Sequence, residues 1–381
     1  MVTKGKKEAR TREAAEKKDK AGDQIKELEA ELSKTKYNKK TQLHVGMIKA
    51  KIAAIKTKEE QKGKGGAKHE GFAVRKSGNA TVVLVGFPSV GKSTLLNKIT
   101  NAESKVGAYA FTTLDVIPGL LEYKHAKIQI LDVPGIVKGA ASGTGRGKEV
   151  ISMMRNADLL LIMIEATNIK QLAVLEKEIF DANIRTNQSK PDVKITKTGK
   201  GGIDLGITCK LSHLEPETII AILKEFKIVN AQIVIREDIT VDQFIDAIEQ
   251  NRNYVASAVV INKIDMIDEA ARQKIKQTIA PDLLISVSQN INIPELKDLI
   301  FDKLNFIRIY TKEVNKEVDM NEPLIMKKGS TIEDVCRKLH KDFVKKFRLA
   351  KIWGSSKFPG QVLKKLNRVV EDNDIIEINL K

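Results

Sequence analysis

The chain has few cysteines, few aromatic residues and no long apolar run. Its two cysteines, Cys209 and Cys336, are far apart with no CxxC pair, and its five histidines form no clustered ligand set. This pattern excludes a disulfide framework and a zinc site of the usual ligand spacing. No stretch approaches the roughly 20 unbroken apolar residues of a membrane span, and the first residues contain no apolar signal core. We therefore expect a cytoplasmic protein without membrane attachment.

The positive charge of the chain is confined to its two ends. The net charge is +17: residues 1–76 hold 22 Lys/Arg against 11 Asp/Glu, residues 307–381 hold 17 against 11, and the stretch between is neutral overall. Basic segments attract polyphosphates through counterion release, so both ends are predicted to contact the ribosome or structured RNA. Because aromatic residues make up only 4% of the chain, backbone and shape recognition are favoured over base stacking. The alternative is that lysine-rich helix surfaces only keep the protein in solution.

Apolar periodicity predicts α-helices at the N-terminus and an α/β domain after them. Residues 5–60 carry two apolar stripes at helical spacing, which indicates a helical hairpin, and glycines then mark a linker. Four buried-strand runs alternate with helical segments, which favours a doubly wound parallel sheet. These runs are residues 81–87, 127–133, 157–166 and 256–264.

The third and fourth strand runs are too far apart for one crossover helix, so we expect an α+β subdomain inserted into the α/β domain. After that domain, two strands, a helix capped by Ser330 or Thr331 and further short strands fit a ubiquitin-like β-grasp module. The expected segments are a helical N-terminal region over 1–62, a linker over 63–78, the nucleotide-binding domain over 79–183 and 241–306, the insertion over 184–240 and the β-grasp module over 307–381.

A phosphate-binding loop follows the first strand. The stretch GFPSVGKS matches G-x-x-x-x-G-K-[ST] and lies between a strand and a helix, the context that makes this motif specific. In such a loop, backbone N–H groups surround the phosphates, Lys92 reaches the β- and γ-phosphates and Ser93 ligates Mg²⁺. The predicted nucleotide contacts here are Gly86, Phe87, Pro88, Ser89, Val90, Gly91, Lys92, Ser93 and Thr94.

The stretch NKID ends the fourth strand and points to guanine. The Asp265 carboxylate can accept hydrogen bonds from N1–H and the exocyclic amine of guanine, a donor pair that adenine lacks. Asn262 and Lys263 are expected to orient this loop and the base. The next strand leads into a segment suited to a backbone contact with the base, formed by Ser286, Val287 and Ser288.

The stretch DVPG, which ends the second strand run, has the form of a switch loop. Asp132 would hold Mg²⁺ through water and the Gly135 N–H would sense the γ-phosphate, with Val133 and Pro134 lining the nucleotide. Thr112 and Thr113 lie in the preceding loop, where a threonine closes over the metal, and the residues alone do not choose between them.

The residue after the switch glycine is Ile136, where many such enzymes carry a glutamine that orients water. An isoleucine side chain cannot orient water, so a fast enzyme that needs no other group is not expected. The intact lysine, serine and aspartate keep the electrostatic part of the site. Nearby basic residues could replace the glutamine or could simply be exposed cations: Lys138, Arg146 and Lys148.

Together these motifs make the chain resemble the developmentally regulated GTP-binding protein (DRG) family, in the Obg branch of translation-associated GTPases. The resemblance extends over nearly the whole length. Beside the phosphate loop and NKID, it is carried by AYAFTTLDVIPG, by the glycine-rich DVPGIVKGAASGTGRGKEVI and by the KTGKGGI of the insertion. At the C-terminus, IWGSSKFPGQ and DNDIIEI correspond to the TGS domain of that family.

The resemblance implies a GTPase of translation that acts near ribosomes, with Mg²⁺ as cofactor and with the N-terminal and TGS elements as docking surfaces. It also implies that Thr113 joins Ser93 as a metal ligand. The segment that would line the nucleotide is Phe111, Thr112, Thr113, Leu114 and Asp115. Eukaryotic members bind a stabilising partner protein, so the resemblance adds such a protein to the candidate partners. Related GTPases that K⁺ activates often have asparagine at the position of Ser89, so K⁺ dependence stays open.

The expected function is hydrolysis of GTP to GDP and phosphate by a monomeric translation factor that associates with the ribosome or RNA. The hydrolysis is expected to be slow in the isolated protein and to be stimulated by a partner or an ion. The residues expected to carry catalysis are Lys92, Thr113, Asp132 and Gly135. The alternative is a basic RNA-binding adaptor that does not hydrolyse GTP and uses it only for structure. Binding that differs between GTP and GDP would distinguish the two.

Overall fold

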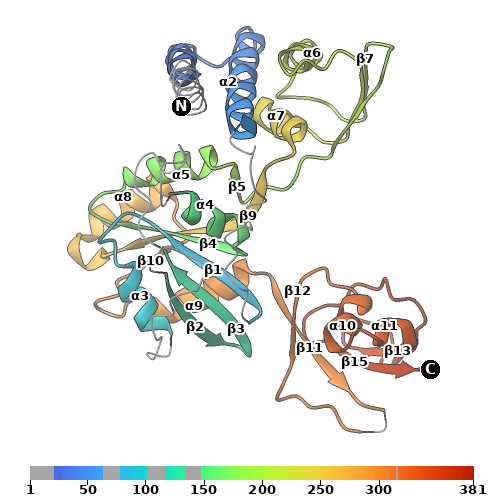
Figure 1. Cartoon of the computed structure of the whole chain (residues 1–381). Helices are drawn as coiled ribbons and strands as arrows, with labels where there is room; N and C mark the ends of the chain where they lie inside the picture. Colours follow the sequence, from blue (N-terminus) through green and yellow to red (C-terminus); the bar gives the residue numbers. More distant parts are fainter. Residues whose placement is uncertain (1–20, 63–77, 101–115, 134–146, 315) are drawn as a thin grey trace, which may run out of the picture. The chain divides into compact units, whose positions relative to one another are not determined.

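The protein divides into two compact units (Figure 1). The structure is a computed structural model that describes residues 21–62, 78–100, 116–133, 147–314 and 316–381. One unit joins the N-terminal helices to residues 189–252, and the other contains the nucleotide-binding and C-terminal domains. Among the described residues, no helix combines the length and apolarity that crossing a bilayer requires.

A seven-stranded sheet forms the centre of the nucleotide-binding domain. The strands follow the order β10, β9, β4, β1, β3, β2, with β5 paired to the start of β9. Helices α3 and α9 pack on one face, and α4, α5 and α8 pack on the other (Figure 1). The strands are β1 Ala80–Val85, β2 Ile117–Tyr123, β3 Ala126–Asp132, β4 Leu159–Glu165, β5 Ile184–Thr186, β9 Asn253–Asn262 and β10 Leu283–Leu284, and the helices are α3 Lys92–Ile99, α4 Gly147–Asn156, α5 Gln171–Asp181, α8 Glu269–Ile279 and α9 Ile293–Lys303.

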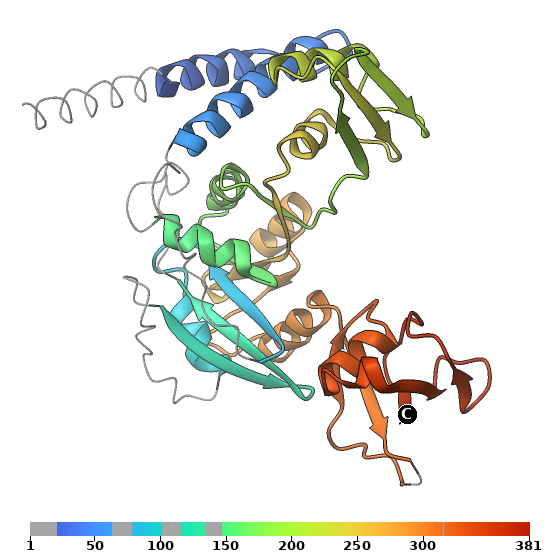
Figure 2. The same ribbon diagram turned by 45° about the vertical axis from the view of Figure 1, so that its right-hand side comes forward.

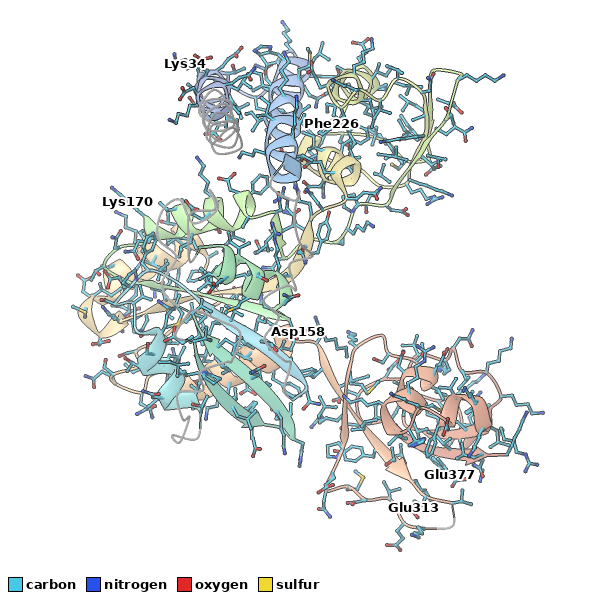
Figure 3. All side chains as sticks on the ribbon, in the orientation of Figure 1. Lys34, Asp158, Lys170, Phe226, Glu313 and Glu377 are labelled. Carbon is cyan, nitrogen blue, oxygen red and sulfur yellow. The ribbon has the colours of Figure 1, made fainter. Side chains whose placement is uncertain are left out.

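The sequence of the central strands explains why helices cover both faces of this sheet. All six residues of β1 are buried, and β4 is buried over LLLIMI, so both faces of these strands must be covered. Between the two strands, Asp158 (labelled in Figure 3) accepts a hydrogen bond from the Thr81 N–H at 3.0 Å. The α/β fold predicted from the sequence is therefore confirmed.

One strand departs from the purely parallel sheet that was predicted. β2 pairs antiparallel with β3 through the turn at Lys124 and His125, whose φ angles are +48° and +64°. Two successive positive φ angles are typical of the type I′ turn, whose twist suits a tight hairpin. The remaining pairings within this sheet are parallel, so the ends of β1, β3, β9 and β10 meet at one edge.

In the first unit, the N-terminal helices pack with the inserted subdomain. The sheet of the insertion has the order β6, β8, β7, and α6 and α7 share an apolar core with β8 and with Ala50 of α2. Helical residues 21–34 lie beside α2 in both views (Figures 1 and 2), and His44 pairs with Glu31 at 3.1 Å. The elements are α2 Gln42–Lys62, β6 Val193–Lys197, β7 Ile203–Ile207, α6 Pro216–Glu225, β8 Ala231–Ile235 and α7 Val241–Glu249.

Specific polar contacts fix α2 on the insertion. The buried Gln42 side chain donates to the His213 carbonyl at 2.7 Å and accepts from the Glu215 N–H at 3.1 Å. Lys49 forms an ion pair with Asp242 at 2.6 Å. These contacts make residues 21–62 and the insertion one folded unit, although they are distant in sequence.

The insertion has different limits from those predicted. The prediction ended it at residue 240, but Phe244 of α7 is fully buried in the same apolar core as α6 and β8. The prediction began it at residue 184, but β5 pairs with β9 of the large sheet. The inserted part therefore spans residues 189–252, because packing and strand pairing define it better than the spacing of strand motifs does.

The C-terminal domain is a β-grasp-like sheet that holds one longer helix, as predicted. The strand order is β12, β11, β15, β13, β14, with β11 and β15 parallel. Thr331, rather than Ser330, caps α10 in a reciprocal arrangement with Asp334. The elements are β11 Phe306–Lys312, β12 Leu324–Lys327, α10 Ile332–Leu339, α11 Phe343–Lys346, β13 Phe347–Trp353, β14 Gln361–Leu363 and β15 Ile375–Leu380.

Two buried carboxylates stabilise this domain. Asp374 is fully buried and accepts hydrogen bonds from the Ser355 N–H, the Ser355 hydroxyl and the Glu371 N–H at 2.6 to 2.8 Å. Glu377 (labelled in Figure 3) accepts from Lys351 of the neighbouring strand at 2.9 Å, and this bond lowers the pKa of the Glu377 carboxyl.

Candidate nucleotide-binding site

The loop between β1 and α3 has the backbone conformation of a phosphate cradle. Ser89 and Gly91 have φ angles of +65° and +98°, so the chain reverses tightly before α3. The Lys92 ammonium lies inside this loop and donates to the carbonyls of Gly86 and Phe87 at 3.1 and 3.0 Å. A Cβ on Gly86 would lie 2.5 Å from the Met163 carbonyl oxygen, so only glycine fits there.

The charged groups of the site are largely withdrawn from water. Lys92 is 8% exposed and Asp132 is 6% exposed, and the Ser93 hydroxyl donates a short hydrogen bond to the Asp132 carboxylate. Burial lowers the pKa of Lys92, although the charge of Asp132 opposes this shift. Burial also raises the pKa of Asp132, opposed by the Ser93 hydrogen bond and by Lys92. Burial thus disfavours both charges, and oppositely charged ligand groups would stabilise them.

Asn262 connects the phosphate loop to the loop that follows β10. Its side chain is almost fully buried, donates to the Val90 carbonyl at 2.9 Å and accepts from the Val287 N–H at 3.1 Å. It also occupies the space beside Gly91, where a Cβ would lie 2.5 Å from Asn262 Nδ2. The two loops are therefore held in one arrangement by a single amide.

The Asp265 carboxylate is oriented by the same loop and remains exposed. Ser286 donates to Asp265 Oδ1 at 2.5 Å, and Ser288 lies 3.5 Å from Oδ2. The Ser286 hydrogen bond is the main cause of the lowered pKa of Asp265, so the carboxyl is ionised and ready to accept hydrogen bonds at neutral pH. This is the state that guanine recognition requires.

Two supporting residues were not predicted from the sequence. Glu165 at the end of β4 pairs with Lys263 at 2.8 Å, and Arg272 of α8 donates to the Ile264 carbonyl at 2.9 Å. Glu165 lies beside Asn262 in the parallel register of β4 and β9. The sequence marks Glu165 only as a charged residue near the end of a buried-strand run, and nothing in the spacing of the motifs marks Arg272.

Among the described residues, the structure brings predicted site residues together in two groups. Lys92, Ser93 and Asp132 meet, and Asp265 meets the serines after β10. The Val133 and Val90 side chains are buried in the apolar cores, so only their backbone can face a nucleotide, whereas Pro88, Ser89 and Thr94 are exposed. The predictions for Phe111, Thr112, Thr113, Leu114, Asp115, Pro134 and Gly135 lie outside the described residues, as do those for Ile136, Lys138 and Arg146.

Known families and proteins match most of this chain. The family model described as a 50S ribosome-binding GTPase matches residues 81–197, the C-terminal region of the same domain matches 200–306, and the TGS domain matches 307–379. A developmentally regulated GTP-binding protein 2 homolog of Dictyostelium discoideum is 41% identical over 93% of this chain and 98% of its own length. The chain belongs to the developmentally regulated GTP-binding protein family.

Further relatives show that the likeness is not limited to one lineage. An uncharacterised GTP-binding protein of Methanocaldococcus jannaschii is 52% identical over 94% of this chain and 93% of its own. Developmentally regulated GTP-binding protein 1 of Xenopus laevis is 41% identical over 93% of this chain and 97% of its own. This DRG family member is thus a GTP-binding protein of the P-loop, translation-associated type with a C-terminal TGS domain, which confirms the family inferred from its motifs.

Proposed function

We propose that this protein hydrolyses GTP to GDP and phosphate and acts in translation on the ribosome or its RNA. The observation that carries the proposal is the pair of buried charges, Lys92 and Asp132, held at the phosphate loop with the Ser93 hydroxyl bonded to the Asp132 carboxylate. Charged groups held ready in a water-poor site are the main means by which phosphoryl-transfer enzymes stabilise their transition state. The neighbouring, ionised Asp265 supplies the preference for guanine.

Mg²⁺ fits the donor atoms of this site. A hard cation prefers oxygen ligands, and the Ser93 hydroxyl and Asp132 carboxylate meet at the end of β3 beside the phosphate loop. The ion, when bound, would neutralise charge on the β- and γ-phosphates. Thr113 stays a predicted further ligand. Activation by K⁺ is part of the proposal to be tested, with Ser89 as the residue on which it would depend.

The rate of the isolated protein is expected to be low. Ile136 cannot orient the attacking water, and GTPases that lack a supplied catalytic group turn over at about 10⁻⁴ to 10⁻² s⁻¹. A group supplied by the ribosome, a partner protein or an ion can add several powers of ten. The basic N- and C-terminal regions support docking on RNA, because the charge excess lies outside the nucleotide-binding domain.

Phosphate release measured with and without ribosomes tests the enzyme assignment. Lys92→Ala and Asp132→Ala are expected to abolish release in both conditions, because each removes a charge that faces the phosphates or the metal. Lys98→Ala, an exposed lysine of the same helix α3, should leave the rate unchanged. Equal rates in the wild type and in the two site variants would refute hydrolysis at this site.

Co-sedimentation with ribosomes separates the proposal from the adaptor alternative. A GTPase that acts on the ribosome must bind it differently in the GTP-bound, GDP-bound and nucleotide-free states. An adaptor in which GTP is only structural would bind equally with GTP and GDP, and its binding would weaken steeply with salt. Nucleotide-independent co-sedimentation of the wild type would therefore favour the adaptor.

A further inference from the structure

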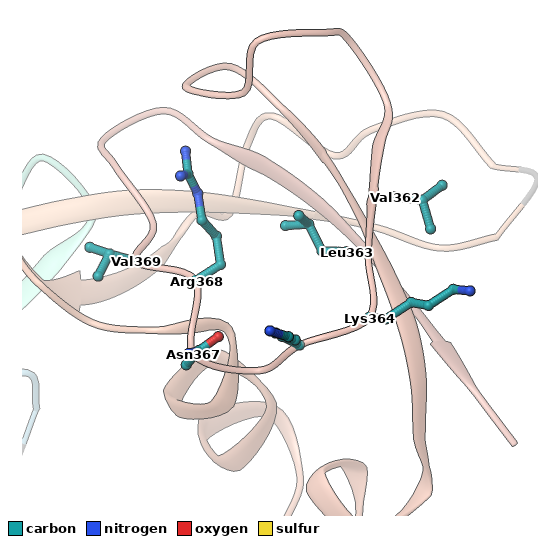
Figure 4. A pocket seen from close by; sticks show the side chains of 7 residues that line it. Val362, Leu363, Lys364, Asn367, Arg368 and Val369 are labelled. Atoms are coloured by element: carbon teal, nitrogen blue, oxygen red, sulfur yellow. The ribbon is translucent and has the colours of Figure 1, made fainter.

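The TGS domain carries an open cavity on the end of β14 and the segment that links β14 to β15. The cavity has a volume of about 740 Å³ and is lined by Val362, Leu363, Lys364, Lys365, Asn367, Arg368 and Val369. In the close view, Lys364 and Arg368 lie towards opposite ends of the lining segment, with Val362 and Leu363 of β14 near the first and Val369 next to the second (Figure 4). Its volume lies within the usual range of ligand pockets.

The cations of this cavity have no carboxylate partner among the described residues. Lys364, Lys365 and Arg368 are exposed, and no ion pair to a described carboxylate involves them. Two nearby acidic residues are engaged elsewhere, since Glu333 pairs with Arg337 of its own helix and Asp372 pairs with Arg308, and the exposed Glu371 forms no described ion pair with these cations. The positive charge of the cavity is therefore available to an anionic ligand.

The backbone of the lining segment is fixed by the start of α10. The Ile332 and Glu333 N–H groups donate to the carbonyls of Arg368 and Leu366, both at 3.0 Å, and the Val370 N–H donates to the Ser330 carbonyl at 2.9 Å. A cavity held by such contacts loses little freedom when it binds a ligand, which favours affinity.

We propose that this cavity binds an unpaired nucleotide of a folded RNA, with the flanking phosphates on Lys364, Lys365 and Arg368. The proposal rests on the proposed function, since it names the RNA contact of the TGS domain. Exposed Val362 and Val369, at 51% and 47%, offer apolar surface to a ribose or base, and Asn367 offers both donor and acceptor groups. A paired helix keeps its bases stacked inside, so only a bulge or loop can place a nucleotide in a hollow between cations.

Binding of two fluorescent RNA hairpins to the full-length protein tests this proposal. The hairpins are identical except that one carries a single bulged nucleotide. The site variant is the triple substitution Lys364→Gln, Lys365→Gln, Arg368→Gln. The matched control removes the same charge from exposed cations of the same domain outside the cavity: Lys341→Gln, Lys345→Gln, Lys346→Gln. Thermal unfolding checks that both variants are folded.

The expected result is a loss specific to the site variant. Each phosphate contact to unpaired RNA makes log affinity fall more steeply with log salt concentration, and three contacts together add about 2 to the steepness of that fall. Over a tenfold rise in salt this corresponds to a loss of about 100-fold in affinity. The wild type and the control should prefer the bulged hairpin and keep the full salt slope. The site variant should bind both hairpins equally, with the reduced slope.

Several results would overturn the proposal. Equal losses in the site and control variants would indicate general electrostatic attraction, and equal binding of both hairpins by the wild type would exclude the unpaired nucleotide. Tighter binding of anionic lipid vesicles or a phosphopeptide at these residues would assign the cavity to another partner. If ribosome co-sedimentation remains nucleotide-dependent while the cavity results fail, only the cavity proposal is refuted. A hairpin preference carried by these residues, without nucleotide-dependent co-sedimentation, would instead refute only the proposed function.

Discussion

The contact between Gly91 and Asn262 allows a quantitative test of how the nucleotide site is held together. In Gly91→Ala, the new Cβ would lie 2.5 Å from Asn262 Nδ2, so the amide has to move. That movement removes the hydrogen bond to the Val90 carbonyl and the one from the Val287 N–H. We expect the phosphate loop and the base-recognition loop to lose their connection.

The cost follows from the buried groups that are left unpaired. Each unpaired buried group costs about 1–3 kcal/mol, and the φ angle of +98° adds about 1–2 kcal/mol for a residue other than glycine. The free energy of unfolding of the nucleotide-binding domain should therefore fall by on the order of 4 kcal/mol. For a domain of this size the midpoint should fall by roughly 10 °C.

A double-mutant cycle tests the reasoning more sharply than either variant alone. Asn262→Ala removes the same two hydrogen bonds, so adding it to Gly91→Ala should cost almost nothing further. The four proteins are compared by calorimetry and by GDP affinity. Gly206→Ala is the control, because its Cβ would lie 3.6 Å from the nearest atom, the Ile233 carbonyl oxygen, and it should change stability by less than about 0.5 kcal/mol. Additive losses from Gly91→Ala and Asn262→Ala would refute the shared-contact account.

Three further predictions concern stability. Gln42→Ala should lower the free energy of unfolding of the first unit, measured in urea, by about 1–3 kcal/mol, because the His213 carbonyl and the Glu215 N–H lose their hydrogen bonds to this side chain. An unchanged urea midpoint would show that the position of α2 does not depend on these two bonds. Asp374→Ala should lower the free energy of unfolding of the TGS domain by about 3 kcal/mol or more, measured by the fluorescence of the single tryptophan, Trp353. Asp342→Ala, at an exposed site, should not lower it. Equal effects of the two substitutions would contradict the role of burial. Burial raises the pKa of Cys336 from 9.0 to about 11, so the folded state holds the thiol proton more tightly than the unfolded state does. The free energy of unfolding should therefore fall by on the order of 2–3 kcal/mol as the pH rises from 9 towards 11. Cys336→Ala should lack this component, and identical pH profiles would contradict it.

Residues of the candidate nucleotide site could be proposed from the sequence because their chemistry is local in sequence. The stretch Gly86 to Ser93 specifies a phosphate loop through its glycines and its position after a buried strand, and Asp265 was recognised from NKID in the same way. The supporting residues were not equally accessible. Glu165 reaches Lys263 only because β4 and β9 are neighbours in the sheet, and Arg272 reaches Ile264 across a turn between elements.

The arrangement of the insertion shows the limit of reading motifs along the chain. Helical periodicity predicted α2, and α7 likewise has one buried apolar side, but periodicity reports only that a helix has such a side and not which surface covers it. The buried Ala50 and Phe244 place both helices against the same core, which groups the N-terminal helices with residues 189–252. β2 was missed for a related reason, because its pairing depends on a turn conformation at Lys124 and His125.

The sequence by itself determined the family, the α/β class, the phosphate loop and the preference for guanine, since these depend on residue types at short, fixed spacings. The tertiary structure decided which distant residues meet, such as Asn262 with Val90 and Val287, and Gln42 with the insertion. It also decided that the cations of the TGS cavity lie without a described carboxylate partner. The physical reason is that hydrogen bonds, burial and charge depend on distance in space, and the folding of the chain brings together groups that sequence separation keeps apart.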